Sequence, residues 1–134
     1  MGRASSLFNG AGEQTLISRV SPTTQQREFL QTRWNELAEH LKVSLKAQHG
    51  HPISTWLQGS YKYGTLIKPV HSDEEYDVDL GVYFEWGKGV EIEPTAEQLR
   101  RWGQQVLVDY QPNCPTKRSV AEPPKQRCSR ASYE

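Results

Sequence analysis

The sequence predicts an α/β fold in which two helices accompany short strands. Apolar residues recur at spacings of three and four in two segments, 21–48 and 95–110, as is typical of helices that bury one face. Between them lie two short apolar segments, 53–58 and 76–86, with the composition and flanking turns typical of strands. Helices on both sides of paired strands indicate one α/β domain, or part of a larger one.

Composition excludes several classes of function. The 16 basic residues balance 16 acidic ones, so no broad face for nucleic acid or for a membrane surface is expected. Cys114 and Cys128 lie at a spacing typical of neither a zinc ribbon nor a disulfide framework. We interpret them as free thiols in a reducing, cytoplasmic environment. No apolar run is long enough to span a membrane, and no secretory signal is expected in residues 1–20.

The first expected element is a helix that begins after Ser21-Pro22 and runs to about Gln48. Ser21 is a favourable N-cap residue, and proline is well tolerated in a first helical turn. Gly50 and Pro52 indicate the end of this helix, because glycine suits a helix C-terminus and proline disfavours helical backbone before it. The residues of its apolar stripe are Leu30, Trp34, Leu37, Leu41 and Leu45.

Strand signals follow the helix. Residues Ile53 to Gln58 predict a short strand, and Ser60 to Thr65 a turn or a short helix. The polar stretch from Val70 to Glu75 predicts a loop. Residues Tyr76 to Trp86 carry the strongest strand signal in the chain.

A second helix is expected to open at Glu93-Pro94-Thr95 and to bury Leu99, Trp102, Val106 and Tyr110. After it the prolines and basic residues of 111–134 predict an irregular tail that leads into an incomplete strand. The basic charges there are not interleaved with aromatic residues, so a solvated loop is favoured over a nucleic-acid patch. We therefore expect a flexible N-terminal segment, 1–20, a core, 21–110, and this tail.

Two carboxylates, Asp77 and Asp79, lie one residue apart in the second predicted strand. Because side chains alternate across a strand, both belong to one face together with Gly81 and Tyr83. Burial of two such carboxylates is unfavourable unless a cation neutralises them. Mg²⁺ takes oxygen ligands from one or two carboxylates together with substrate phosphates. The pair predicts a divalent metal site, and the opposite, core-facing set is Val78, Leu80, Val82 and Phe84.

The dipeptide Gly59-Ser60 ends the first predicted strand. Glycine lets the backbone approach a ligand closely, and the amides of a following helical turn with the Ser60 hydroxyl can face an anion. Lys62 or Lys68 could add a positive charge to such a site. Either motif alone is common, but the glycine–serine turn and the carboxylate pair together, each at its own strand, predict a triphosphate-binding site.

The order of these motifs resembles the nucleotidyltransferase superfamily of the polymerase β type. The closer resemblance is to the cGAS/DncV-like nucleotidyltransferases (CD-NTases) of the bacterial anti-phage systems known as CBASS. It covers most of residues 20–110, and the Gly-Thr-x-Ile-x-Pro run narrows it to that branch. The motifs that carry it are Leu57-Gln58-Gly59-Ser60, Tyr63-Gly64-Thr65-Leu66-Ile67-Lys68-Pro69 and Tyr76-Asp77-Val78-Asp79-Leu80.

The resemblance implies a nucleotidyltransferase-type mixed sheet flanked by helices, binding of ATP or GTP, and Mg²⁺ or Mn²⁺ as cofactor. It implies synthesis of a cyclic di- or trinucleotide second messenger, with CBASS regulatory proteins as partners. By the same resemblance Gly59 and Ser60 hold the donor triphosphate, Gln58 lies beside it, and Asp77 and Asp79 are the metal-binding and catalytic carboxylates.

The chain departs from the family pattern in one respect. Relatives add a third metal-binding carboxylate on a neighbouring strand and a large helical domain. In this chain Gln126 to Tyr133 resembles the strand before that carboxylate. Asp109 and Glu134 are poor substitutes for the third carboxylate. We therefore expect a truncated catalytic core that is inactive alone. The alternatives are a minimal nucleotidyltransferase of the toxin–antitoxin type that modifies RNA or protein, and a non-catalytic fragment that binds nucleotide or a partner.

Overall fold

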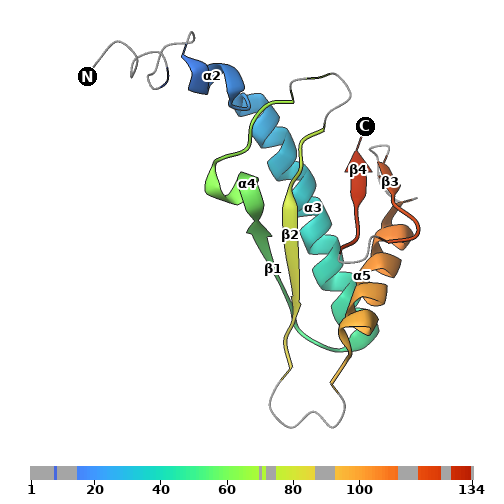
Figure 1. The fold of residues 1–134 in the computed structure, drawn as a ribbon. Coiled ribbons are helices and arrows are strands. Elements are labelled where there is room, and N and C mark those ends of the chain that lie inside the picture. Colours follow the sequence, from blue (N-terminus) through green and yellow to red (C-terminus); the bar gives the residue numbers. More distant parts are fainter. Residues whose placement is uncertain are drawn as a thin grey trace. The chain divides into compact units, whose positions relative to one another are not determined.

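The structure, a computed structural model, describes residues 8, 15–69, 71, 75–86, 93–111, 118–124 and 128–133. Its helices and strands confirm the predicted α/β class (Figure 1). Among the described residues the strands form two two-stranded sheets, β1–β2 and β3–β4. The elements in chain order are α2 (Leu16–Val20), α3 (Thr24–His49), β1 (Ile53–Gln58), α4 (Gly59–Tyr63), β2 (Asp79–Phe84), α5 (Ala96–Tyr110), β3 (Arg118–Val120) and β4 (Ala131–Tyr133).

The chain divides into two compact units. The first comprises residues 1–36 and 56–81, and the second comprises residues 37–55 and 82–134. Helix α3 and strands β1 and β2 each contribute residues to both units. Each unit is built from segments distant in sequence, so its packing depends on long-range contacts.

The first unit ties the short helix α4 to the helices that precede it. The phenolic hydroxyl of Tyr61 in α4 donates to the carbonyl of Arg27 in α3 at 3.4 Å. After α4, the amide of Lys68 donates to the carbonyl of Val20, the last residue of α2, at 2.6 Å. Leu66, between these two anchors, is buried. The segment that begins at the predicted glycine–serine turn is thus held at two points.

The cap of α3 differs from the prediction. Ser21, the expected N-cap, instead terminates α2, a helix that the sequence analysis did not anticipate. Thr23 caps α3: the amide of Gln26 donates to the Thr23 hydroxyl at 3.2 Å, and the Thr23 amide donates to the Gln26 side-chain oxygen at 2.8 Å. This reciprocal pair satisfies two amides that a helix start leaves without partners.

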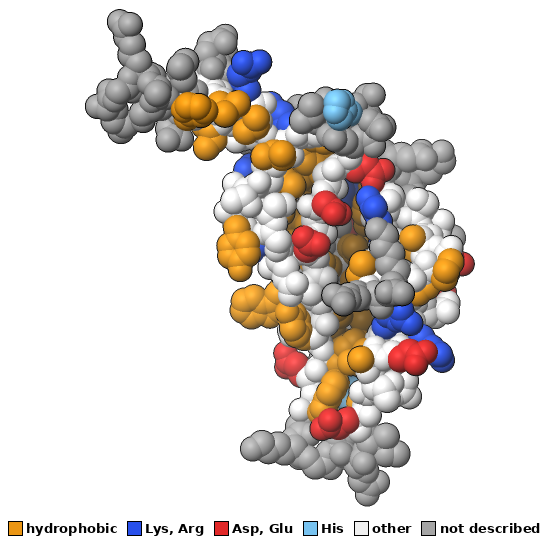
Figure 2. Space-filling model, viewed as in Figure 1, with side chains coloured by type: hydrophobic (Ala, Val, Ile, Leu, Met, Phe, Trp, Pro, Cys, Tyr) orange, Lys and Arg blue, Asp and Glu red, His pale blue; other side chains and the backbone are white. Residues whose placement is uncertain are grey.

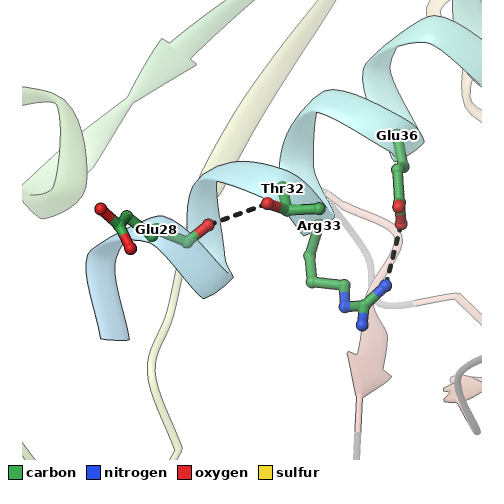
Figure 3. A network of polar contacts seen from close by, with 4 residues as sticks. All are labelled: Glu28, Thr32, Arg33 and Glu36. Carbon is green, nitrogen blue, oxygen red and sulfur yellow. Dashed lines mark hydrogen bonds and ion pairs between the residues drawn. The ribbon is translucent and has the colours of Figure 1, made fainter. Parts of the chain in front are cut away.

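The N-terminal half of α3 presents a polar surface that is stabilised by local contacts (Figure 3). The Thr32 hydroxyl donates to the carbonyl of Glu28 at 3.0 Å, and the Arg33 guanidinium pairs with Glu36 at 3.0 Å. Such i,i+3 ion pairs at a helix surface contribute only a few tenths of a kcal/mol, about 0.2–0.5. These polar side chains face the solvent, and the apolar stripe of α3 packs against the rest of the fold.

The second unit contains most of the buried core. Both predicted helical stripes are confirmed, since Leu41 and Leu45 of α3 and Val106 of α5 are buried. Ring stacking adds to this packing: His40 stacks on Tyr110 with centroids 4.0 Å apart, and His49 stacks on Trp102 with centroids 3.7 Å apart. The remaining buried hydrophobic residues of this unit are Ala38 and Leu107.

Helix α5 begins as predicted, but the tail does not remain irregular. Thr95 and Gln98 form a capping box at the start of α5. Strand β4 lies within residues 126–133, the segment expected to form an incomplete strand, and β3, which the sequence analysis did not anticipate, pairs antiparallel with it, with Ser119 opposite Ser132. The side-chain amide of Gln104 in α5 donates to the Ala121 carbonyl at 2.9 Å. A hydrogen bond from a helix to the end of the hairpin is a tertiary contact that local propensity does not reveal.

Strand β2 is shorter than the predicted segment from Tyr76 to Trp86, because Asp79 is its first residue and Phe84 its last. Most of the predicted loop from Val70 to Glu75 lies outside the described residues, as does Cys114. Cys128 is an exposed free thiol, as expected. None of the helices in the described part of the chain combines the length and the apolar character needed to cross a membrane.

The reassigned cap of α3 can be tested by paired substitutions. Thr23→Ala removes the hydroxyl acceptor, so the free energy of unfolding should fall by about 1 kcal/mol, within the usual range for such caps. Ser21→Ala, the change at the residue first expected to cap α3, should leave it almost unchanged. Urea denaturation followed by circular dichroism would compare the two, and a larger loss for Ser21→Ala would contradict the assignment.

The stacked His49 predicts a pH dependence of stability. Burial, with a smaller effect from the nearby charge of His51, lowers the pKa of His49 below 6.5. The unfolded chain therefore binds more protons than the folded chain between that lowered pKa and 6.5, so stability falls as the pH falls through this window.

His49→Phe keeps a ring against Trp102 and removes the titration. Its thermal stability should fall less than that of the wild type between about pH 7.5 and about pH 5. Identical slopes in the wild type and in His49→Phe would show that His49 does not contribute.

Candidate functional site

The β1–β2 pair positions the predicted site. The Glu85 amide donates to the Pro52 carbonyl at 2.8 Å just outside one end of the pair, and Asp79 lies against Gly59 at the other end. The two strands therefore run antiparallel, which Figure 1 shows. This pairing brings the end of β1 beside the beginning of β2. The glycine–serine turn and one of the two carboxylates, 20 residues apart in sequence, consequently meet.

Two features favour glycine at position 59: the conformation of the backbone and the close approach of a neighbouring side chain. Its φ of +65° lies in the left-handed region, which side chains with a Cβ rarely adopt. A Cβ at this position would also collide with the Oδ2 atom of Asp79 and would lie 3.0 Å from its Cγ. The close approach therefore needs a residue without a side chain. The structure brings together Gly59 and Asp79, two of the residues that the sequence selected independently.

The exposures from Asp77 to Phe84 follow the predicted faces except at Gly81, which was assigned to the exposed face and is partly buried. Asp77, Asp79 and Tyr83 are exposed, whereas the residues between them are partly buried. The carboxylates do not lie in the middle of a buried strand, however: Asp77 precedes β2, Asp79 is its first residue, and both are exposed. Burial consequently imposes no need for a neutralising cation. The case for metal binding rests instead on the oxygen ligands that the two carboxylates offer and on their position on one face of the strand.

The turn between β1 and α4 is closed by backbone contacts. The carbonyl of Ser60 accepts the amides of Thr65 at 2.9 Å and Leu66 at 3.1 Å. Gly64, with φ +71°, ends α4 in the left-handed conformation. The side chain of Gln58, the N-cap residue of α4, makes no capping hydrogen bond to this helix.

The other candidates differ in exposure. Gln58 and Lys62 are exposed, and Ser60 and Lys68 are partly buried. Lys68 is anchored through its backbone, so its segment has a defined place after α4. These residues all belong to the first compact unit, as do Asp77 and Asp79.

A divalent metal fits part of this arrangement. Carboxylate oxygens are the ligands that Mg²⁺ and Mn²⁺ prefer, and Mg²⁺ is commonly bound by one or two carboxylates with substrate phosphates completing the shell. Within the described ranges no group of three or more His, Cys, Asp and Glu side chains could hold a metal ion. Asp109 is hydrogen-bonded to Gln105 at 2.8 Å on α5 and belongs to the second unit. Glu134 lies outside the described residues.

Sequence reasoning missed two exposed aromatic residues beside the turn. Trp56 is 61% exposed on β1, and Tyr63 is 78% exposed at the end of α4. The signal for Trp56 was present, because it is two residues before Gln58 and strand alternation assigns both to one face. Tyr63 lies in neither a predicted apolar stripe nor a predicted strand, so periodicity gave no signal that its side chain would be exposed beside the turn.

Comparison with known proteins places these residues in a family. The family model described as "Cyclic GMP-AMP synthase DncV-like, nucleotidyltransferase domain" matches residues 53–134, more than half of the chain. The cyclic GMP-AMP synthase of Escherichia albertii is 45% identical over 69 residues, which are 49% of this chain and 16% of that protein. The chain thus corresponds to a small part of this relative.

The contact between Gly59 and Asp79 predicts a specific steric penalty. Gly59→Ala and Gly64→Ala both place a Cβ on left-handed backbone, which costs about 1–2 kcal/mol. Only the Cβ at position 59 would also meet Asp79, since nothing lies within 4 Å of the one at position 64. Gly59→Ala should therefore lower the free energy of unfolding further than Gly64→Ala does.

A double-mutant cycle isolates that excess. In an Asp79→Ala background the clashing oxygen is gone, so the penalty of Gly59→Ala should approach that of Gly64→Ala. Chemical denaturation of the four variants measures the coupling. Additive effects of Gly59→Ala and Asp79→Ala would rule out the contact.

Proposed function

The chain belongs to the family of DncV-like nucleotidyltransferase domains, and from this premise we propose that it is the nucleotide-binding part of a cyclic oligonucleotide synthase. The proposed reaction joins ATP, GTP or both into a cyclic di- or trinucleotide second messenger for anti-phage defence. The observation that carries the proposal is the contact of Asp79 with the backbone of Gly59. It brings a carboxylate, a possible metal ligand, against the turn at which we propose that the phosphates bind.

The matched relative supports the choice of product class. This relative is named as a cyclic GMP-AMP synthase, and it shares 45% identity over the aligned 69 residues. That alignment covers 16% of the relative, so the activity, the substrates and the partners of a whole protein of this type are proposed here. CBASS regulatory proteins are the corresponding proposed partners.

In this proposal the residues near the turn hold the triphosphate. Gly59 permits close approach of the backbone, the amides that open α4 and the Ser60 hydroxyl donate hydrogen bonds to phosphate oxygens, and Gln58 lies beside them. Because Gly59 has no Cβ, the bound phosphates can lie near the Asp79 carboxylate. A Cβ at this position would occupy space that the Asp79 side chain takes up.

Asp77 and Asp79 would hold Mg²⁺ or Mn²⁺ between the protein and the phosphates. When bound, such an ion neutralises phosphate charge and favours attack of a ribose hydroxyl on the α-phosphate with loss of pyrophosphate. The two carboxylates fit the oxygen-donor preference of either ion and leave coordination positions for phosphate and water. Their exposure on one face makes them accessible to a metal–nucleotide complex.

Product analysis tests the activity directly. The full polypeptide that the gene encodes would be incubated with labelled ATP and GTP and with Mg²⁺ or Mn²⁺, followed by phosphatase treatment. Phosphatase-resistant cyclic products support the proposal. Label transferred to RNA or to protein would indicate instead a nucleotidyltransferase of the toxin–antitoxin type, and binding without any transfer would indicate a non-catalytic nucleotide-binding protein.

The proposed metal site predicts that removal of either carboxylate weakens the binding of Mg²⁺–ATP. Asp79→Asn removes a charge that the metal requires, so affinity for Mg²⁺–ATP should fall by roughly tenfold or more, the equivalent of about 1.4 kcal/mol. Asp77→Asn should act in the same direction. Isothermal titration calorimetry with and without EDTA measures the effect.

Asp109→Asn is the matched control, because it makes the same chemical change at an exposed carboxylate in the second unit. It should leave the affinity unchanged. If Asp79→Asn and Asp109→Asn bound Mg²⁺–ATP equally well, Asp79 would have no part in holding the metal.

A further inference from the structure

We propose that Trp56 is a contact for the base of the bound nucleotide, with its indole as a stacking platform beside the triphosphate site. This inference rests on the proposed function, since it assumes that a nucleoside triphosphate binds at Gly59, Ser60 and Asp79. It adds a residue that recognises the aromatic part of the ligand. The residues considered so far all act on its phosphates.

The exposure of Trp56 distinguishes it from the other tryptophans. Its side chain is 61% exposed, whereas Trp34, Trp86 and Trp102 are partly buried. Trp102 packs against His49 and Phe84, and Trp86 lies edge-on to His51. A large apolar ring left open to water in a strand gains little from burial of its apolar surface in the fold. A ligand that covers the ring would recover that free energy.

The position of Trp56 connects it to the candidate site. It precedes Gln58 by two residues in β1, and the two exposed side chains share a strand face while the intervening Leu57 is partly buried. With a rise of about 3.3 Å per residue, Trp56 lies roughly 7 Å along the strand from Gln58 and about 10 Å from Gly59. That separation is comparable to the reach of a ribose and base from the phosphates.

The surface around Trp56 suits a ligand with a charged end and an aromatic end. Figure 2 shows hydrophobic side chains beside β1 and acidic side chains over the start of β2 on the same face. Trp56, Gln58, Asp77 and Asp79 all belong to the first unit. A metal–triphosphate matches the carboxylate end, and a flat purine ring matches the indole. An apolar protein segment would match the indole and leave the carboxylates without a partner.

Stacking also defines what selectivity Trp56 can provide. Every nucleobase presents a π-face, so stacking on an aromatic side chain tolerates different bases. Trp56 should therefore strengthen the binding of ATP and of GTP to similar extents. Discrimination between the two bases requires hydrogen bonds from other residues.

The test separates base binding from phosphate binding by using two kinds of probe. Isothermal titration calorimetry with Mg²⁺ would measure ATP and GTP, which carry a base, and inorganic triphosphate, which does not. Trp56→Ala should weaken ATP and GTP by about fivefold or more, the range of aromatic stacking on a base, and leave inorganic triphosphate unchanged. Trp56→Phe retains a ring and should restore most of the loss.

Phe29→Leu is the matched control, because Phe29 is an exposed aromatic residue on α3 in the same unit. It should bind all three probes as the wild type does. Circular dichroism checks the fold of each variant, and Trp56→Leu replaces Trp56→Ala if the latter unfolds. Quenching of tryptophan fluorescence by ATP, which should be lost in Trp56→Phe, provides a second readout.

Equal weakening of ATP and inorganic triphosphate by Trp56→Ala would overturn the inference, because it would indicate a purely structural role for the strand. An unchanged affinity for ATP and GTP in Trp56→Ala would overturn it as well. In both cases the proposed function survives, since the wild type still binds nucleotide. If the wild type binds neither ATP nor inorganic triphosphate, the proposed function and the inference fail together.

Discussion

The close approach of the Asp79 carboxylate to the backbone of Gly59 is the contact on which the candidate site depends. It requires left-handed backbone at Gly59 and the absence of a Cβ there. Gly59 is the first residue of α4, and Asp79 is the first residue of β2. This contact therefore lies where the start of β2 meets the turn that follows β1. Any larger residue at position 59 would displace the carboxylate or the turn.

Other contacts hold the turn from behind. The carbonyl of Ser60 accepts two amides of the following segment, and Tyr61 reaches the backbone of α3. The bond from Lys68 to Val20 fixes the chain after α4. Backbone groups that are constrained in this way lose little further freedom when a ligand binds, which favours binding. The site is thus placed by backbone hydrogen bonds more than by salt bridges, since the ion pairs found among the described residues lie on α3 and α5.

Strand alternation separates packing from chemistry. Leu80, Val82 and Phe84 are partly buried, and Asp79 and Tyr83 are exposed. A strand of six residues can therefore stabilise the fold with one face and offer charged and aromatic groups with the other. In β1 the same division leaves Trp56 and Gln58 exposed and Leu57 partly buried. The features that support nucleotide binding all derive from this alternation and from the turn at Gly59.

The sequence by itself determined the α/β class, both long helices, the first strand and the face on which the carboxylates lie. These features follow from periodicity along the chain, which is a local property. The family resemblance also rests on short motifs that can be read from neighbouring residues. The tertiary structure decided the rest. Ser21 ends α2 and Thr23 caps α3, and β3 exists because β4 pairs with it. The contact of Asp79 with Gly59 joins residues that no local pattern relates. Strand pairing and close approach depend on partners distant in sequence, so only the folded chain could reveal them.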